Sequence, residues 1–323
     1  MSLQIDKLSK RYGSLWALRD LSFEVENGSV IGIFGASGSG KSTLLKVISG
    51  AIKPSGGTIT LDSQDITKTK SGERKIYRHS GPAEPRLTQL LGLFSHKTSS
   101  GAQQFARFEE PLAKPGKVLL LDEPFCNMDE RLRQECFTLV RNSAKKRSRI
   151  VIFASSDFDQ IAGFTDEVAV LSRGEIIQTG TPQEIYENPA SVEIARMTGD
   201  NNLITARRLT STDADLPEFH SMDGGHRLFA ECTDKAGLGA INQNITLAIR
   251  PEQVSMSMGA SFPEDNLLKG VVTSIKFRGA TSLIEFDAAG LKIETRVFKV
   301  VGLKIGDECM LGLPPHRILI LKD

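Results

Sequence analysis

The chain has 323 residues, a formal net charge of +1, 40% hydrophobic residues and 24% charged residues. This length predicts two domains, and the near-neutral charge excludes strong long-range attraction to nucleic acid or to an anionic membrane. No apolar run approaches the roughly 18 residues of a membrane-spanning helix, and the polar start of the chain lacks the apolar core of a secretory signal. The four cysteines form no C-x-x-C pair, so we expect reduced thiols rather than a metal centre.

The first part of the chain predicts alternating strands and helices. Continuous apolar runs at 30–34, 118–121 and 149–154 indicate parallel strands that are covered on both faces. Residues 42–49 predict a helix after the glycine-rich turn that ends the first of these runs. Strands separated by helices are typical of an α/β sheet.

The pattern changes near residue 200. Helical patterns cease there, 211–225 reads as a polar loop, and glycine and proline punctuate the remainder. Five short strands are predicted, at 245–249, 271–277, 282–286, 291–297 and 317–321. We therefore predict an α/β sheet domain over 1–200, followed by a small all-β, OB-like barrel over 201–323.

A phosphate-binding motif follows the first buried strand. It matches G-x-x-x-x-G-K-[ST], and the residues are Gly35, Ala36, Ser37, Gly38, Ser39, Gly40, Lys41 and Ser42, with Thr43 next. The glycines allow backbone amides to turn toward phosphate oxygens, and the helix that follows adds its free N–H groups. We expect Lys41 at the β- and γ-phosphates and Ser42 at Mg²⁺. A chance match is the alternative, and the strand–loop–helix context argues against it.

A second buried strand ends in two carboxylates, Asp122 and Glu123. Asp122 is expected beside the phosphate-binding loop, where it can hold Mg²⁺. Glu123 follows directly and can act as the general base that polarises the attacking water. The two segments together predict an α/β domain of the P-loop NTPase type, with ATP and Mg²⁺ as cofactors.

At this point the chain resembles the ATP-binding-cassette (ABC) family. Within it, the chain is similar to the importer ATPases for maltose, spermidine and ferric iron, which carry a C-terminal β-module. The segments that carry the resemblance are 8–13, 124–129, 174–182, 184–189 and 248–252. The resemblance implies that Tyr12 stacks on adenine and that Asp129 lies at the nucleotide site; an ordinary strand aromatic is the alternative for Tyr12.

The resemblance also implies partners and a location. It implies an ATP hydrolase coupled to transport, a peripheral protein on the cytoplasmic face of the membrane, bound to transmembrane permease subunits. Two ATPase subunits would pair, as a homodimer or as a heterodimer with another ABC ATPase. No nucleic acid partner is expected.

Four family features are altered in this sequence. His79 stands where the family has a glutamine, and Ser156 stands where it has a switch histidine. Ser100 and Gly101 remain at the signature position, where Ala102 replaces a glycine. The helical subdomain is largely missing, at about 80–105, and this makes docking on the permease subunits doubtful.

These changes predict ATP binding with weak hydrolysis. The loss of one preorganised donor, as at Ser156, costs about 3–4 kcal/mol, or roughly 10²–10³ in rate. Two alternatives stay open: a catalytically poor, nucleotide-sensing regulatory subunit that pairs with an intact ABC ATPase, and a soluble ABC ATPase outside transport. The sequence does not name a transported solute.

Overall fold

The computed structural model describes residues 2–80, 112, 116–125, 128–209, 215–232, 238, 240–259, 262 and 264–321. Contacts divide the chain into two compact units, Met1–Glu187 and Asn188–Asp323. This division precedes the change of sequence pattern near residue 200, because helix α7 (Val192–Met197) packs on the core of the second unit. Among the described residues, no helix is both long and apolar enough to cross a bilayer.

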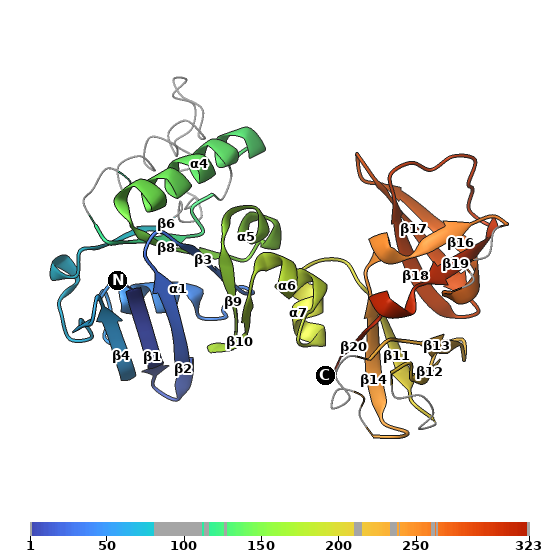
Figure 1. The fold of residues 1–323 in the computed structure, drawn as a ribbon, viewed down its shortest axis with the longest axis horizontal. Helices are drawn as coiled ribbons and strands as arrows, with labels where there is room; N and C mark the ends of the chain where they lie inside the picture. The colour runs from blue at the N-terminus through green and yellow to red at the C-terminus, as the bar shows by residue number, and fades with distance from the viewer. Residues whose placement is uncertain are drawn as a thin grey trace. The chain divides into compact units, whose positions relative to one another are not determined.

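The first unit contains two sheets (Figure 1). Its strands are β1 (Ser2–Tyr12), β2 (Leu15–Glu26), β3 (Val30–Phe34), β4 (Gly56–Leu61), β5 (Gln64–Asp65), β6 (Ile76–Ser80), β7 (Val118–Asp122), β8 (Ile150–Ser155), β9 (Glu167–Ser172) and β10 (Glu175–Gly180). Its helices are α1 (Lys41–Ile48), α4 (Glu130–Arg147), α5 (Phe158–Phe164) and α6 (Pro182–Glu187). A short 3₁₀ turn, η1 (Ser71–Glu73), precedes β6.

The central sheet has the strand order β10-β9-β3-β8-β7-β6. Its described pairs are parallel, except that β10 runs antiparallel to β9. The five residues of β3, and likewise of β7, are all buried, as expected for parallel strands covered on both faces. The predicted α/β domain is confirmed, and the predicted strands correspond to β3, β7 and β8.

Helix α1 joins the two sheets of the first unit through one hydrophobic core. Leu44, Leu45 and Val47 of α1 pack in this core with Leu3 of β1 and Ile33 of β3. The antiparallel sheet, with strand order β2-β1-β4-β5, therefore covers the helix that follows the phosphate-binding loop. On another surface of the central sheet, α4 contacts β8 and α5 contacts β3 and β8.

The second unit is an all-β module of two five-stranded antiparallel sheets around one core. The strand orders are β13-β12-β11-β14-β20 and β15-β19-β16-β17-β18. The strands are β11 (Asn202–Arg207), β12 (Glu218–Ser221), β13 (Arg227–Phe229), β14 (Asn244–Ile249), β15 (Ser255–Ser257), β16 (Asn266–Phe277), β17 (Ser282–Ala288), β18 (Leu291–Val297), β19 (Glu308–Leu313) and β20 (Leu319–Leu321). Two 3₁₀ turns, η3 (Pro251–Gln253) and η4 (Pro315–Arg317), connect them.

Two details of the β-module differ from the sequence prediction. The segment 211–225, predicted as a loop, contains β12, because Phe219 is fully buried and β12 pairs with both β11 and β13. The last strand begins at Leu319 rather than at 317, because η4 occupies Pro315–Arg317. The predicted all-β class of this unit is confirmed.

Candidate functional site

The site begins with the loop between β3 and α1. Gly40 has a φ of 113°, and a Cβ there would lie 2.6 Å from the carbonyl oxygen of Ala17, so this position requires glycine. At Gly35 a Cβ would lie 2.3 Å from the carbonyl oxygen of Leu171. The loop is thus packed against β2 and β9, and only glycine fits at two of its positions.

A second contact fixes the loop from the turn between β9 and β10. The backbone N–H of Gly174 donates to the carbonyl of Ser39 over 2.9 Å, while the Gly174 carbonyl accepts from the N–H of Arg19 over 2.7 Å. Ser39 is buried in this framework, whereas Ala36 is exposed; neither residue lines the cavity over the loop. The phosphate-binding loop is therefore held in shape by backbone bonds from other elements.

Lys41 is the first residue of α1 and is 6% exposed. Its amine donates to the carbonyls of Gly35, over 2.7 Å, and Ala36, over 3.1 Å. The amine also lies 3.7 Å from Oε1 of Glu123. Burial lowers the pKa of the Lys41 amine from its ordinary value, and the negative charges of Glu123 and Asp122 oppose that shift.

The carboxyl end of β7 brings Asp122 next to α1. The hydroxyl of Ser42 donates to Oδ1 of Asp122 over 3.0 Å, and Asp122 is 8% exposed. The sequence prediction that these two residues lie together is matched by this contact. A hydroxyl and a carboxylate are hard oxygen donors, which Mg²⁺ takes together with water and phosphate oxygens. The residues present therefore fit a magnesium ion, and among the described residues no group of three or more His, Cys, Asp or Glu suggests another metal site.

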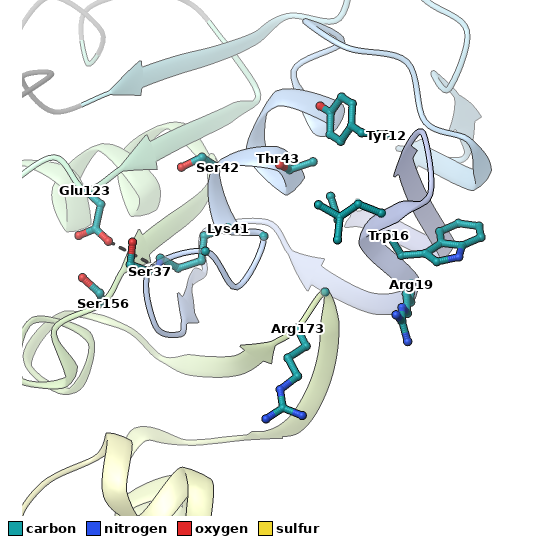
Figure 2. A pocket seen from close by; sticks show the side chains of 15 residues that line it. Tyr12, Trp16, Arg19, Ser37, Lys41, Ser42, Thr43, Glu123, Ser156 and Arg173 are labelled. Carbon is teal, nitrogen blue, oxygen red and sulfur yellow. Dashed lines mark ion pairs between the residues drawn. The ribbon is translucent and has the colours of Figure 1, made fainter.

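Glu123 leaves β7 in an unusual backbone conformation. Its φ is 46°, in the left-handed region, and its N–H donates to the carbonyl of Ala154 over 3.0 Å. Non-glycine residues in this region cost about 1–3 kcal/mol and cluster at functional sites. The bend turns the side chain toward Lys41, and Figure 2 shows the two groups joined as an ion pair.

A cavity of about 690 Å³ lies over the loop. Its lining residues are Tyr12, Leu15, Trp16, Ala17, Arg19, Ser37, Gly38, Gly40, Lys41, Ser42, Thr43, Glu123, Ser156, Arg173 and Gly174. Figure 2 shows Glu123 and Ser156 on one side of Lys41, with Tyr12 and Trp16 on the other. The cavity thus has a polar end with a carboxylate, a loop of amides in the middle, and an aromatic end.

The aromatic end is formed by the hairpin of β1 and β2. Tyr12 pairs with Leu15 across the hairpin, and the amine of Lys10 lies 5.0 Å from the Tyr12 ring centroid. Tyr12 is 48% exposed, so one face of its ring is available to a ligand. This arrangement suits the stacking role expected for Tyr12 from the resemblance.

His79 and Asp129 are not among the lining residues of this cavity. On β6, His79 pairs with Leu121 and Ser80 pairs with Asp122. Because paired residues of a parallel ladder project to the same face, Ser80 shares the face of Asp122 and His79 does not. Asp129 caps α4: its carboxylate accepts a hydrogen bond of 2.9 Å from the N–H of Leu132.

The remaining predicted features lie outside the described residues. Ser100 and Gly101, proposed at the signature position, fall in this part of the chain, as does almost all of the segment at about 80–105. Their roles stay predictions.

Sequence reasoning missed several contributors to the site, among them Arg173, Trp16 and Ser155. Arg173 occupies a two-residue turn with a φ of 49°, next to Gly174, and lines the cavity. Trp16 also lines it, under the guanidinium of Arg11. Ser155 lies 3.4 Å from Glu123. The Arg173-Gly174 pair between two strands could have predicted a tight hairpin turn with Arg173 in it. Nothing local in the sequence indicated Trp16 or Ser155.

Comparisons with known proteins agree with this geometry. The "ABC transporter" family model matches residues 18–89, and the "TOBE domain" model matches residues 247–321. The probable sulfate/thiosulfate import ATP-binding protein CysA of Chlorella vulgaris is 32% identical, over 62% of this chain and 99% of that protein. The CysA protein of Synechocystis sp. is 31% identical, over 76% of this chain and 82% of its own length.

A third relative spans both units. The spermidine/putrescine import ATP-binding protein PotA of Clostridioides difficile is 28% identical, over 99% of this chain and 97% of that protein. The sequence relatives, the P-loop and the β-module at 247–321 all point to one group of ATP-binding proteins. The chain therefore belongs to the ABC transporter ATPase family, in its importer-type branch with a C-terminal TOBE module.

Proposed function

We propose that this chain is the subunit of an ABC importer that binds and hydrolyses Mg²⁺–ATP to energise uptake of a small solute. The observation that carries the proposal is the meeting of four side chains at the start of α1 and the end of β7. Ser42 bonds to Asp122 over 3.0 Å, and Lys41 lies 3.7 Å from Glu123. Lys41, Ser42 and Glu123 thus line one cavity, and Asp122 is bonded to Ser42 beside it.

Each of the site residues binds or acts on a different part of Mg²⁺–ATP. Tyr12 stacks on the base, while Lys41 and the amides of 35–43 bind the phosphates. Ser42 and Asp122 would hold Mg²⁺, which would supply positive charge to neutralise the phosphates. Glu123 accepts a proton from the water whose oxygen attacks the γ-phosphorus. The bond between the γ-phosphorus and the bridging oxygen breaks, and ADP leaves with that oxygen.

We infer that turnover is weak because of position 156. Ser156 is exposed at the cavity and offers one short hydroxyl where the family has a histidine. A missing preorganised donor lowers the rate by roughly 10²–10³. The variant Ser156→His should therefore hydrolyse Mg²⁺–ATP faster than the wild type, in a steady-state phosphate-release assay. An equal or lower rate would count against this explanation of weak turnover.

The same proposal includes the assembly. Permease subunits in the membrane would hold the protein at its cytoplasmic face, and two ATPase subunits would pair, each binding nucleotide. The relatives, which are import ATP-binding proteins, support this role. We further propose that the nucleotide-binding domain ends near residue 200 and that the β-module over 201–323 regulates or stabilises the pair.

A second function, a nucleotide-sensing subunit with little catalysis, is favoured by one observation, namely Ser156 at the cavity. The two functions differ in the turnover of the purified wild type. In an ATPase, the purified wild type hydrolyses Mg²⁺–ATP, and Lys41→Ala weakens ATP binding and abolishes this turnover. In a sensor, purified wild type binds ATP without turnover, and turnover appears only in mixtures with an intact ABC ATPase.

A further inference from the structure

Ser155 connects the proposed general base to the first turn of α5. It is the last residue of β8 and is fully buried. Its hydroxyl lies 3.4 Å from Oε2 of Glu123 and 3.4 Å from Oε1 of Gln160, and it accepts a hydrogen bond of 3.1 Å from the N–H of Asp157. Because a serine hydroxyl carries one proton, it donates to only one of the two acceptors at a time.

The orientation of Gln160 is fixed by Asp157, the N-cap of α5. The carboxylate of Asp157 accepts from the N–H groups of Asp159, over 3.0 Å, and Gln160, over 3.4 Å, and from Nε2 of Gln160 over 2.9 Å. An ionised carboxylate only accepts hydrogen bonds, so the amide nitrogen of Gln160 faces Asp157 and its oxygen faces Ser155.

The N-cap of α5 is therefore connected to Glu123 through Ser155. In a usual capping box, the third helical residue bonds back to the N–H of the cap residue. In this chain the N–H of Asp157 goes to the Ser155 hydroxyl, and the side-chain oxygen of Gln160 approaches the same hydroxyl. The hydroxyl is held on one side by α5 and faces Glu123 on the other.

We propose that Ser155 is a positioning residue that holds the carboxylate of Glu123 for proton abstraction, with Gln160 as its alternative acceptor. This inference rests on the proposed hydrolytic function. Oε1 of Glu123 faces Lys41 over 3.7 Å, and Oε2 faces Ser155, so both oxygens have a partner. Lys41 and Ser155 together therefore fix the orientation of the carboxylate, and Gln160 offers the hydroxyl a second acceptor.

The test compares the full chain carrying Ser155→Ala or Ser155→Thr with the wild type, in steady-state hydrolysis and in binding of a non-hydrolysable ATP analogue. Loss of a hydrogen bond to a charged group should lower kcat about tenfold in Ser155→Ala. KM and analogue affinity should change little, since Ser155 does not line the cavity. Ser155→Thr keeps the hydroxyl and should recover most of the rate.

Ser221→Ala is the matched control. Ser221 is 4% exposed, donates to the carbonyl of Asp223 over 2.6 Å and accepts from the N–H of His226 over 2.8 Å, all within the β-module. Its loss removes a similar buried hydroxyl without touching Glu123, so kcat should stay at the wild-type value. An unchanged kcat in Ser155→Ala, or a rate in Ser155→Thr as low as in Ser155→Ala, would overturn the proposal.

Crystal structures separate this proposal from the proposed function. If the wild type shows no turnover, the proposed hydrolytic function is wrong. The position of the Glu123 carboxylate in crystals of the variants then tests the positioning role of Ser155 by itself. The Glu123 carboxylate should move away from position 155 in Ser155→Ala and stay in Ser155→Thr. A carboxylate in the same place in both variants would overturn the positioning role.

Discussion

Lys41 carries its charge in a nearly buried position. Its amine is bonded to the carbonyls of Gly35 and Ala36, and burial lowers its pKa. In Lys41→Met the stem remains but the charge at the phosphates is lost, so ATP affinity should fall about tenfold or more, as expected for a charge-assisted contact. Isothermal titration with ATP checks this. Lys10→Met is the control, since Lys10 does not line the cavity, and its affinity loss should be much smaller.

Ser42 gives a residue-scale test of the magnesium site. Because its hydroxyl bonds to Asp122, it lies where a metal between this pair and the phosphates would be held. In Ser42→Ala, ATP affinity measured with Mg²⁺ should drop several-fold, whereas the affinity measured with EDTA should match the wild type under the same conditions. An equal loss in both buffers would mean that Ser42 contacts phosphate rather than metal.

At the scale of elements, Arg74 ties the end of α1 to the chain before β6. The side chain is 4% exposed and donates to four carbonyls, of Val47, Ile48, Thr67 and Thr69, over 2.8–2.9 Å. Val47 and Ile48 end α1, where carbonyls have no partner within the helix. The cation also lies at the negative end of the helix dipole. Arg74 therefore anchors the helix that carries Lys41 and Ser42.

Arg74→Met should destabilise the first unit by roughly 2–4 kcal/mol, because four buried or part-buried carbonyls lose the Arg74 donor, and of these the Val47 carbonyl keeps a bond from the N–H of Gly50. Chemical denaturation followed by tryptophan fluorescence reports this change, since Trp16 is the single tryptophan and lies in the first unit. Arg131→Met on the outer face of α4, where Arg131 is 91% exposed, serves as the control and should stay within about 0.5 kcal/mol. A similar small change for Arg74→Met would contradict the anchoring role.

The hairpin of β12 and β13 carries a pH-dependent contact. Arg227 donates twice to Glu218, over 2.6 and 2.8 Å, and lowers the pKa of that carboxyl below its ordinary 4.5; His220 contributes in the same direction. The pKa of Glu218 is thus lower in the folded chain than in the unfolded chain. The ion pair therefore stabilises the folded state fully above the unfolded-state pKa, and this stabilisation is lost as the pH falls through the folded-state pKa.

The melting temperature of wild type should therefore exceed that of Glu218→Gln at pH 7, and the difference should shrink as the pH falls below 4.5. Calorimetry at several pH values measures it. Glu308→Gln removes an exposed ion pair with Lys269 in the same module and should show little difference at any pH. A difference for Glu218→Gln that grows toward acid would have the wrong sign.

At the scale of the whole molecule, the sequence predicted those features that contiguous residues encode. The phosphate-binding loop is local, because its glycines, Lys41 and Ser42 follow one another, and the buried strands are continuous apolar runs. The position of Asp122 beside Ser42 was predicted because a phosphate-binding loop and a buried strand ending in Asp-Glu occur together in P-loop NTPases. The all-β class of the second unit was evident from short strands between glycines.

Such local patterns could not predict contacts between residues that lie far apart in the sequence. The Ser155–Glu123 contact depends on the adjacency of β7 and β8, and the position of His79 depends on the register of β6 against β7. Strand β12 was missed because it has a single buried apolar side chain, Phe219, among polar residues. Register and strand order are set by the packing of the whole unit, and no local spacing in the sequence records them.

The most direct test of the central claim is Mg²⁺-dependent ATP hydrolysis by the purified full chain, beside Glu123→Gln. Glu123 faces Lys41 in the cavity, and Gln keeps its size but cannot accept the proton of water. We predict slow turnover by the wild type, and binding of ATP without turnover by Glu123→Gln. Equal turnover by both proteins, or no ATP binding by the wild type, would contradict the account.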